Sequence, residues 1–322
     1  MSILFIVLGL GGLVFGANLL VDGASALSRR FGVSPLVIGL TVVAFGTSAP
    51  ELTVSLAAAL GGAGAISYGN VVGSNIANIL LILGLTALLR PLQVGSSTVR
   101  YEIPMAIFAS VAVVALGLDS LGIQGAGSAA DILSRGDSLV LLGFFGVFLL
   151  YTLASARRDS SLREGAQAAP AVRGSVLLPI LKVLGGLALL VVGGKLLVDG
   201  AVDIAETLGV SQRIIGLTIV AVGTSMPELA TSIAAALKGE QDIAVGNIVG
   251  SNIFNVFCIL GIGGLITPLE IPGGSLVDSA VHLAASLILL IFALGGGGRR
   301  LDRWEGGIML AGFLGYTLWL VL

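Results

Sequence analysis

Apolar residues follow one another in ten long runs along this 322-residue chain, and charged residues, prolines or glycine clusters separate the runs. Each run approaches or exceeds the roughly 20 apolar residues that a helix needs to cross the hydrocarbon core of a bilayer. The pattern therefore predicts an all-α membrane protein with ten transmembrane helices, whose ends are defined to within a few residues. The expected helices cover residues 3–27, 34–60, 65–89, 101–118, 137–155, 176–202, 211–237, 241–266, 276–295 and 304–322.

Composition places the chain outside the range of soluble domains. Hydrophobic residues make up 56% of it, charged residues only 11%, and its mean hydropathy is +1.08. The single cysteine, Cys258, excludes a disulfide within the chain, and the single histidine, His282, excludes a multi-histidine zinc site. The N-terminus lacks a charged segment before its apolar run, so we expect a first span there and not a cleaved signal peptide.

The two halves of the chain are copies of one another. Residues 33–92 align without a gap with residues 210–269, which lie 177 positions further on, and 35 of the 60 aligned residues are identical. Five apolar runs precede the polar stretch 156–175 and five follow it. Because five is odd, the second set enters the membrane from the opposite side, which makes the repeats inverted. We predict a first five-helix repeat in residues 1–155, a cytoplasmic linker in 156–175 and an inverted second repeat in 176–322.

Lys and Arg residues in the loops predict the orientation. Loops on one side carry twelve of them, and loops on the other side carry only Arg135 and Arg213. Under the positive-inside rule the more basic side faces the cytoplasm, which puts both termini outside it. A short chain rich in Ala and Gly is typical of a prokaryote, so we expect the inner cell membrane. The twelve basic residues are Arg29, Arg30, Arg90, Arg100, Arg157, Arg158, Arg163, Arg173, Lys238, Arg299, Arg300 and Arg303.

Two near-copies of one motif place ionisable groups inside apolar runs. Gly-Thr-Ser-x-Pro-Glu occurs at residues 46–51 in the second run and at residues 223–228 in the seventh. A charged group at membrane depth costs roughly 3 kcal/mol or more, so it indicates a function or a partner. On a helix, Thr47, Ser48 and Glu51 share one face. The proline of each motif offers no N–H to the carbonyl four residues back, which leaves that carbonyl in need of another partner.

Further polar residues follow in the third and eighth runs. Ser74 and Asn78 are one turn apart, as are Ser251 and Asn255, so each pair offers two oxygen atoms on one helix face. Together with the first motif they form an all-oxygen ligand set, which suits hard cations such as calcium, sodium or potassium. Two carboxylates balance the charge of one divalent ion or of two monovalent ions. A site that can bind either one divalent ion or two monovalent ions can exchange the two kinds of ion across a membrane, which predicts an antiporter.

These stretches resemble the alpha repeats of the cation/calcium antiporter superfamily. Gly-Thr-Ser-x-Pro-Glu-Leu followed by Gly-Ser-Asn-x-x-Asn is similar to the repeats of its sodium/calcium exchanger branch, in the prokaryotic form with two alpha repeats. The resemblance implies ten spans, external termini, and exchange of several sodium ions for one calcium ion by alternating access. It also implies a set of metal ligands, with Ala44 and Ala221 acting through their carbonyls: Ala44, Thr47, Ser48, Glu51, Ser74, Asn78, Ala221, Thr224, Ser225, Glu228, Ser251 and Asn255.

The resemblance and the repeat symmetry also predict how the protein works. The first and sixth spans lack the motifs and are long and rich in glycine, so we expect them to slide against the ligand-bearing spans. Potassium-dependent members carry Asp where this chain has Asn255, which argues against potassium co-transport. The linker is too short for the regulatory calcium-binding domains of animal exchangers. We expect a secondary transporter and not an enzyme, with calcium and sodium as the transported ions and no cofactor. We also expect it to lie in the lipid bilayer, to bind no nucleic acid and to function as a monomer.

Other functions stay open at this point. A calcium/proton exchanger would use the same two glutamates, although proton-coupled relatives usually carry Gly-Asn in place of Gly-Thr-Ser. A calcium channel could place carboxylates near a pore axis. An intramembrane enzyme would need a nucleophile and a base, and no such arrangement is recognisable. For single residues, Asn70, Asn75, Asn247 and Asn252 are expected to serve packing, Lys195 to pair with Asp199 or extend toward the surface, and His282 to have no role in transport.

Overall fold

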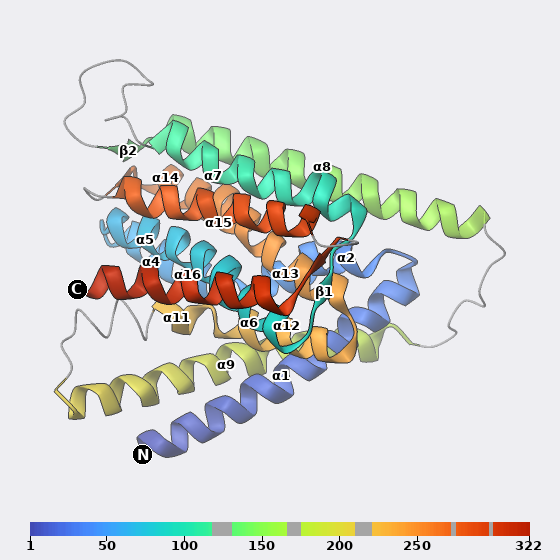
Figure 1. Cartoon of the computed structure of the whole chain (residues 1–322), viewed down its shortest axis with the longest axis horizontal. Coiled ribbons are helices and arrows are strands. Elements are labelled where there is room, and N and C mark those ends of the chain that lie inside the picture. Colours follow the sequence, from blue (N-terminus) through green and yellow to red (C-terminus); the bar gives the residue numbers. More distant parts are fainter. Residues whose placement is uncertain (118–130, 166–174, 210–220, 272–274, 296–298) are drawn as a thin grey trace.

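The structure is a computed structural model that describes all residues except 118–130, 166–174, 210–220, 272–274 and 296–298 (Figure 1). Helices make up nearly all of the described chain. Two short antiparallel ladders join the halves. One pairs β1 (Leu92–Gln93) with β4 (Arg300–Leu301), and the other pairs β2 (Ile132–Leu133) with β3 (Leu269–Glu270).

The helices of the first half follow the predicted runs and are interrupted by short π-helical segments, which often occur at functional sites. They are α1 (Ser2–Phe31), α2 (Pro35–Ile38), η1 (Gly39–Val43), α3 (Ala44–Thr47), α4 (Ala49–Leu60), α5 (Gly64–Ile76), η2 (Ala77–Leu83), α6 (Gly84–Leu89), η3 (Thr98–Glu102), α7 (Ile103–Gly117) and α8 (Arg135–Gly165). Helix α8 continues ten residues beyond its predicted end, into the stretch that the sequence predicts as a linker.

The second half repeats this order. Its elements are α9 (Leu177–Thr207), α11 (Ala221–Thr224), α12 (Met226–Lys238), α13 (Gln241–Phe254), η6 (Asn255–Leu260), α14 (Gly261–Ile266), α15 (Ser275–Gly295) and α16 (Arg303–Val321). The first ten residues of the seventh predicted span, 211–220, lie outside the described residues.

Local signals explain several of these ends. Pro35 occupies the first turn of α2, and the Ser34 hydroxyl accepts a hydrogen bond from the Val37 N–H. Helix α16 begins with a capping box formed by Asp302 and Glu305. Helix α1 ends at Gly32, whose φ of 68° lies in the left-handed region that glycine adopts without strain.

Seven helices of the described chain are long and apolar enough to cross a membrane, and eight are if the bent pair Pro35–Thr47 and Ala49–Leu60 counts as one span. The sequence predicts ten. Helix α16 is not among the seven because glycines, tryptophans and Glu305 dilute its apolar composition, and the seventh predicted span is only partly described. The chain is a multi-pass membrane protein.

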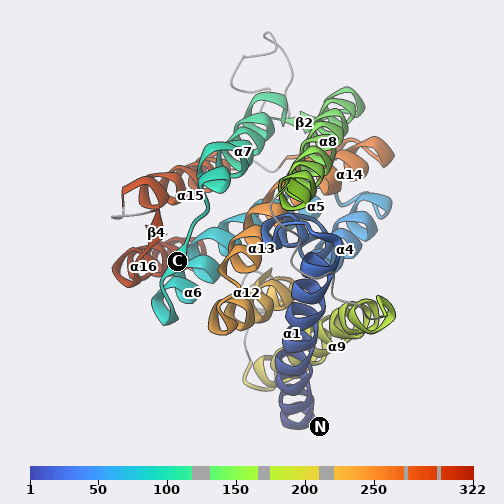
Figure 2. The ribbon, with the colours of Figure 1, turned by 90° about the vertical axis from the view of Figure 1, so that its right-hand side faces the viewer.

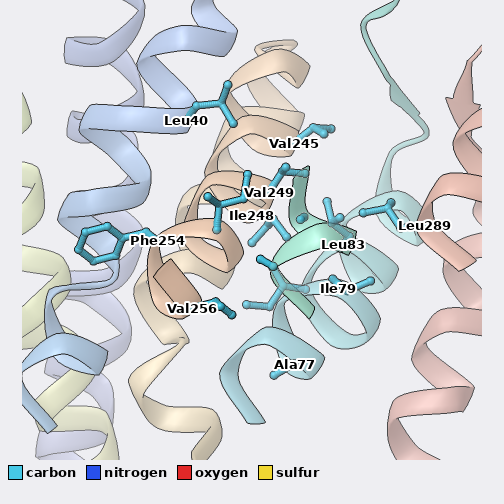
Figure 3. Close-up of a cluster of buried hydrophobic side chains, with 14 of the residues drawn as sticks. Leu40, Ala77, Ile79, Leu83, Val245, Ile248, Val249, Phe254, Val256 and Leu289 are labelled. Atoms are coloured by element: carbon cyan, nitrogen blue, oxygen red, sulfur yellow. The ribbon is translucent and has the colours of Figure 1, made fainter. Parts of the chain in front are cut away.

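The core lies where the two halves meet. The most apolar windows of the third and eighth spans, Gly64–Leu89 and Gln241–Ile266, are 78% and 89% buried, whereas those of α1 and α9 are each only 28% buried. Figure 3 shows side chains from η1, η2, α13, η6 and α15 meeting in this core, among them Leu40, Ile79 and Ile248. Helices α7 and α8 lie on one side of it and α1 and α9 on the other (Figures 1 and 2).

Helices α1 and α9 pack against each other through glycines. A Cβ atom placed on Gly16 would lie 2.8 Å from the Gly186 carbonyl oxygen, and one placed on Gly193 would lie 2.9 Å from the Gly9 carbonyl oxygen. Because both contacts involve backbone atoms, any larger residue would force the helices apart. Gly9 and Gly16 recur 177 positions later as Gly186 and Gly193, so the pair is built from equivalent surfaces of the two halves.

Two ion pairs involve residues of these helices. Lys195 pairs with Asp199 within α9 at 3.0 Å, which confirms the prediction. Asp22 of α1 pairs with Lys238 at the end of α12 at 2.5 Å, and the same ammonium donates to the Asn18 carbonyl. Spacing along one helix predicts the first pair, whereas the second depends on how α1 meets α12.

Candidate cation site

Glu51 and Glu228 occupy equivalent places at the centre of the molecule. The helix of the second span breaks at Ser48, where the chain bends by 48°, and α4 starts with Ala49 and Pro50. The same break occurs at Ser225, before Pro227 in the first turn of α12. Both follow from the proline, which cannot donate to the carbonyl four residues back. Each glutamate therefore lies in the first turn of a helix, and both are 0% exposed.

Serine hydroxyls link each carboxylate to the other half of the chain. Ser225 Oγ donates to Glu51 Oε1 at 3.0 Å, and Ser48 Oγ donates to Glu228 Oε1 at 2.9 Å. The sequence predicts that each serine shares a helix face with the glutamate of its own motif. In the structure each serine instead bonds the glutamate of the other motif, which brings the two motifs together.

A second hydroxyl approaches each carboxylate from the neighbouring span. Ser74 Oγ lies 3.4 Å from Glu51 Oε1, and Ser251 Oγ lies 3.5 Å from Glu228 Oε1. The other oxygen of each carboxylate, Oε2, is buried and has no hydrogen-bond partner among the described residues. A buried oxygen without a partner costs about 1–3 kcal/mol, more when charged. Two such atoms at equivalent positions indicate a place where a cation completes the bonding.

Four asparagines form a network across the centre of the molecule. Asn75 Nδ2 donates to the Asn252 carbonyl at 3.1 Å, and Asn252 Nδ2 donates to the Asn75 carbonyl at 3.4 Å. Because a backbone carbonyl only accepts, these bonds fix which way each side-chain amide points. The Oδ1 atom of Asn75 then accepts from Asn255 Nδ2, and that of Asn252 accepts from Asn78 Nδ2, both at 3.0 Å.

This network turns the oxygen atoms of Asn78 and Asn255 away from their amide partners. Both Oδ1 atoms are buried and have no hydrogen-bond partner in the described part of the chain. With the two glutamate Oε2 atoms they give four such oxygens, all belonging to residues that the sequence singles out as ligands. Asn75 and Asn252, which the sequence predicts to serve packing, orient these predicted ligands through hydrogen bonds.

Another pair of asparagines donates hydrogen bonds to the backbone carbonyls of the two glutamates. Asn70 Nδ2 donates to the Glu51 carbonyl at 3.2 Å, and Asn247 Nδ2 donates to the Glu228 carbonyl at 3.4 Å. Asn247 Oδ1 also accepts from Thr47 Oγ1 at 3.0 Å. Sequence reasoning gives these asparagines a packing role, and their position one turn before the Gly-Ser-Asn stretch was the available signal for a link to the glutamates.

The remaining predicted ligands lie at the helix breaks. The Ala44 carbonyl accepts from the Ser48 N–H at 3.1 Å and lies 3.4 Å from Ser251 Oγ. In the second half, Ala221 and Thr224 are the first and last residues of α11, directly before the break. The predicted ligands thus lie on the second, third, seventh and eighth spans. These four spans meet at the centre of the molecule, and each is broken or contains a π-helical segment.

The chemistry of this set is that of a hard-cation site. Its donors are carboxylate, hydroxyl and amide oxygens, and no group of three or more His, Cys, Asp or Glu side chains that could hold a metal ion occurs among the described residues. Oxygen ligands with two negative charges suit calcium and sodium better than zinc or copper.

Substitution of Ser225, one of the two serines that bond the glutamate of the other motif, tests this hydrogen bonding. We expect Ser225→Ala to weaken ion binding roughly 5- to 30-fold, because Glu51 loses a charge-assisted hydrogen bond worth about 1–2 kcal/mol. Thr53→Ala is the matched control, since its side chain is exposed and, in the described part of the chain, its hydroxyl bonds the Ala49 carbonyl of its own helix. Half-saturating calcium concentrations of the two purified variants measure the effect. Equal values for both variants would contradict the assigned bond.

Comparison with known proteins covers nearly the whole chain. The sequence profile described as "Sodium/calcium exchanger protein" matches residues 1–154 and 178–322. Inner membrane protein YrbG of Escherichia coli is 41% identical over 98% of this chain and 95% of its own length. Sodium/calcium exchanger MaX1 of Methanosarcina acetivorans is 35% identical over 98% of this chain and 97% of its own length. A solved structure of the sodium-calcium exchanger NCX_Mj, soaked with 2.5 mM Na⁺ and 0.1 mM Ca²⁺, is similar with a TM-score of 0.79 and 34% identity, over 97% of this chain and 96% of the other.

Proposed function

Because this chain belongs to the sodium/calcium exchanger family, we propose that it exchanges sodium ions for a calcium ion across the membrane by alternating access. It is a secondary transporter and uses no cofactor. The observation that carries the proposal is the pair of buried glutamates, Glu51 and Glu228, each with one oxygen free of hydrogen bonds within the described chain. Two carboxylates compensate one calcium ion, and the same two compensate the sodium ions that replace it.

The site residues have distinct parts in this proposal. Glu51 and Glu228 are the ligands that both ions share, since only they carry charge. The remaining oxygens complete the coordination at positions around them, and the neutral amides of Asn78 and Asn255 serve sodium. The hydroxyl and carbonyl ligands are those of Thr47, Ser48, Ser74, Thr224, Ser225 and Ser251 with the carbonyls of Ala44 and Ala221.

We further propose that the chain crosses the membrane ten times, as two inverted repeats in residues 1–155 and 176–322 joined by a cytoplasmic linker, 156–175. The bonding of the site supports the inverted repeats, because its main bonds come in pairs of equivalent residues: Ser48 to Glu228 corresponds to Ser225 to Glu51. Both termini lie outside the cytoplasm, and the protein resides in the inner cell membrane and works as a monomer.

Alternating access in this proposal comes from α1 and α9 sliding together against the ligand-bearing helices. Their mutual glycine contacts make them one unit. An apolar groove of about 330 Å³ separates α1 from α12, with Leu13 and Val14 on one wall and Leu229 and Ile233 on the other. Apolar side chains form no hydrogen bonds across this groove, so few bonds would have to break when α1 and α9 slide along α12. The Asp22–Lys238 pair is one bond that must open when α1 moves along α12.

Calcium uptake into proteoliposomes tests the proposal. We expect vesicles loaded with sodium and diluted into sodium-free buffer to take up calcium, because outward sodium flow drives inward calcium flow. Vesicles with equal sodium on both sides are the control and should take up little. Uptake that ignores sodium but follows a pH gradient would replace the proposal by calcium/proton exchange. Uptake that needs neither gradient would indicate a channel.

A further inference from the structure

His282 breaks the symmetry of the asparagine network. It lies in α15, is 1% exposed, and its Nε2 atom is 3.3 Å from Asn75 Nδ2. The equivalent position of the first half, 177 residues earlier, is Met105. A thioether is a weak acceptor, whereas an imidazole nitrogen is a strong one. The two halves therefore orient their site asparagines by the same backbone bonds, and only one half adds a histidine.

The surrounding bonds determine the state of the imidazole. The Asn252 carbonyl can only accept, so the Asn75 atom that faces it and His282 is the nitrogen. An unprotonated Nε2 can accept the second N–H of Asn75, and this arrangement requires the neutral tautomer with its proton on Nδ1. Ser110 Oγ of α7 lies 3.1 Å from the same Nε2 and 3.1 Å from the Ala106 carbonyl oxygen, and its single proton can be donated to either acceptor.

The orientation of the Asn75 amide in turn determines the orientation of Asn255 in the candidate site. With both N–H groups of Asn75 bound, its Oδ1 faces Asn255 Nδ2 at 3.0 Å. The amide of Asn255 is thereby turned so that its Oδ1, buried and without a partner among the described residues, faces away from Asn75. A reversed Asn75 amide would offer nitrogen to Asn255 and would favour the opposite arrangement, with N–H groups in place of the ligand oxygen.

We propose that His282 is a positioning residue, whose Nε2 holds the Asn75 amide and so keeps the Asn255 oxygen available to a bound sodium ion. This inference rests on the proposed function, since it concerns the sodium ligand of the same site. A role in packing alone would not require a histidine, because the equivalent position of the first half accommodates a methionine. The ligand oxygen of the second half is thus held more firmly than that of Asn78.

Histidine labelled with ¹⁵N gives a direct test, because the chain has one histidine, so both ring-nitrogen signals belong to it, and their couplings to the ring protons distinguish Nδ1 from Nε2. We expect the spectrum of the purified wild-type protein at neutral pH to show Nε2 unprotonated and Nδ1 protonated. A spectrum with the proton on Nε2 would overturn the proposal, since that nitrogen could not accept from Asn75.

Substitutions test the effect on transport. His282→Met copies the other half and removes the strong acceptor, and we expect the half-saturating sodium concentration to rise roughly five-fold, the effect of one hydrogen bond. His282→Gln places an amide oxygen near the position of Nε2 and should restore sodium affinity to within about two-fold of wild type. Ser279→Ala is the packing control: Ser279 is buried on the same helix one turn before His282, and in the described chain its hydroxyl bonds the Tyr68 hydroxyl, so we expect no change in sodium affinity.

A double-substitution cycle separates positioning from general damage. In an Asn255→Asp background the carboxylate presents two equivalent oxygens, so His282→Met should no longer alter sodium affinity. In an Asn78→Asp background the five-fold effect should persist. The same loss in both backgrounds, or none in the wild-type background, would refute the inference. Wild-type vesicles without sodium-dependent calcium uptake would instead refute the proposed function itself.

Discussion

Glu51→Gln is expected to reduce sodium-driven calcium uptake at least 100-fold. The substitution keeps the shape of the side chain, and the Ser225 hydroxyl can still donate to the remaining oxygen. It removes one of the two charges that balance calcium, and it can place an N–H group where the unpartnered Oε2 atom lies. An uncompensated charge in the membrane interior costs roughly 3 kcal/mol or more, which corresponds to a factor above 100. Initial rates of radioactive calcium uptake in proteoliposomes give the measurement.

Because the site is built from equivalent residues of the two halves, the same experiment can be done on the second glutamate. Glu228→Gln should have an effect of the same order, because Glu228 has the same burial and the same pattern of hydroxyl donors. Glu270→Gln is the matched control, since Glu270 is exposed at the end of β3. If Glu51→Gln kept more than a tenth of the wild-type rate, the carboxylate would not be a shared ligand.

Gly16→Leu is expected to have the second largest effect. The new side chain would collide with the backbone of α9, because even a Cβ atom at this position comes within 2.8 Å of the Gly186 carbonyl oxygen and 2.9 Å of the Leu190 nitrogen. Overpacking costs about 1–3 kcal/mol, and here backbone must move. We expect a lower melting temperature and a loss of exchange of at least ten-fold, because α1 and α9 no longer move as one unit.

Gly11 provides the matched control for this experiment. It lies on the same helix, and a Cβ atom there would meet nothing within 4 Å. Gly11→Leu should therefore leave both the melting temperature and the exchange rate close to wild type. The sliding account would be contradicted if Gly16→Leu lowered thermal stability while the exchange rate stayed unchanged. Thermal unfolding in detergent and uptake in vesicles give the two readouts.

The amino-acid sequence predicts most of the helical segments and the places where two of them break, because both depend on patterns along the chain. Apolar runs mark the helical segments, and the prolines at positions 50 and 227 predict the breaks that the structure has at Ser48 and Ser225. The gap-free duplication predicts that the two motifs are equivalent. The membership in the sodium/calcium exchanger family, suggested by the motifs, is confirmed by the match over both halves.

Contacts between distant parts of the chain could not be predicted from these patterns. The crossing of Ser48 to Glu228 and of Ser225 to Glu51 depends on how the halves meet, not on spacing within a helix. The same holds for the ion pair of Asp22 with Lys238. The contact of His282 with Asn75 is a further example: a lone histidine in an apolar run has no local signal, and only the folded chain brings it to the asparagine network.

Simultaneous measurement of sodium efflux and calcium influx in the same vesicles tests the central claim most directly. Proteoliposomes loaded with labelled sodium would be diluted into sodium-free buffer with or without labelled calcium. The account predicts that sodium leaves quickly only when calcium is outside, that calcium enters only when sodium is inside, and that both flows disappear in Glu51→Gln. Calcium entry at the same rate with and without internal sodium would contradict it.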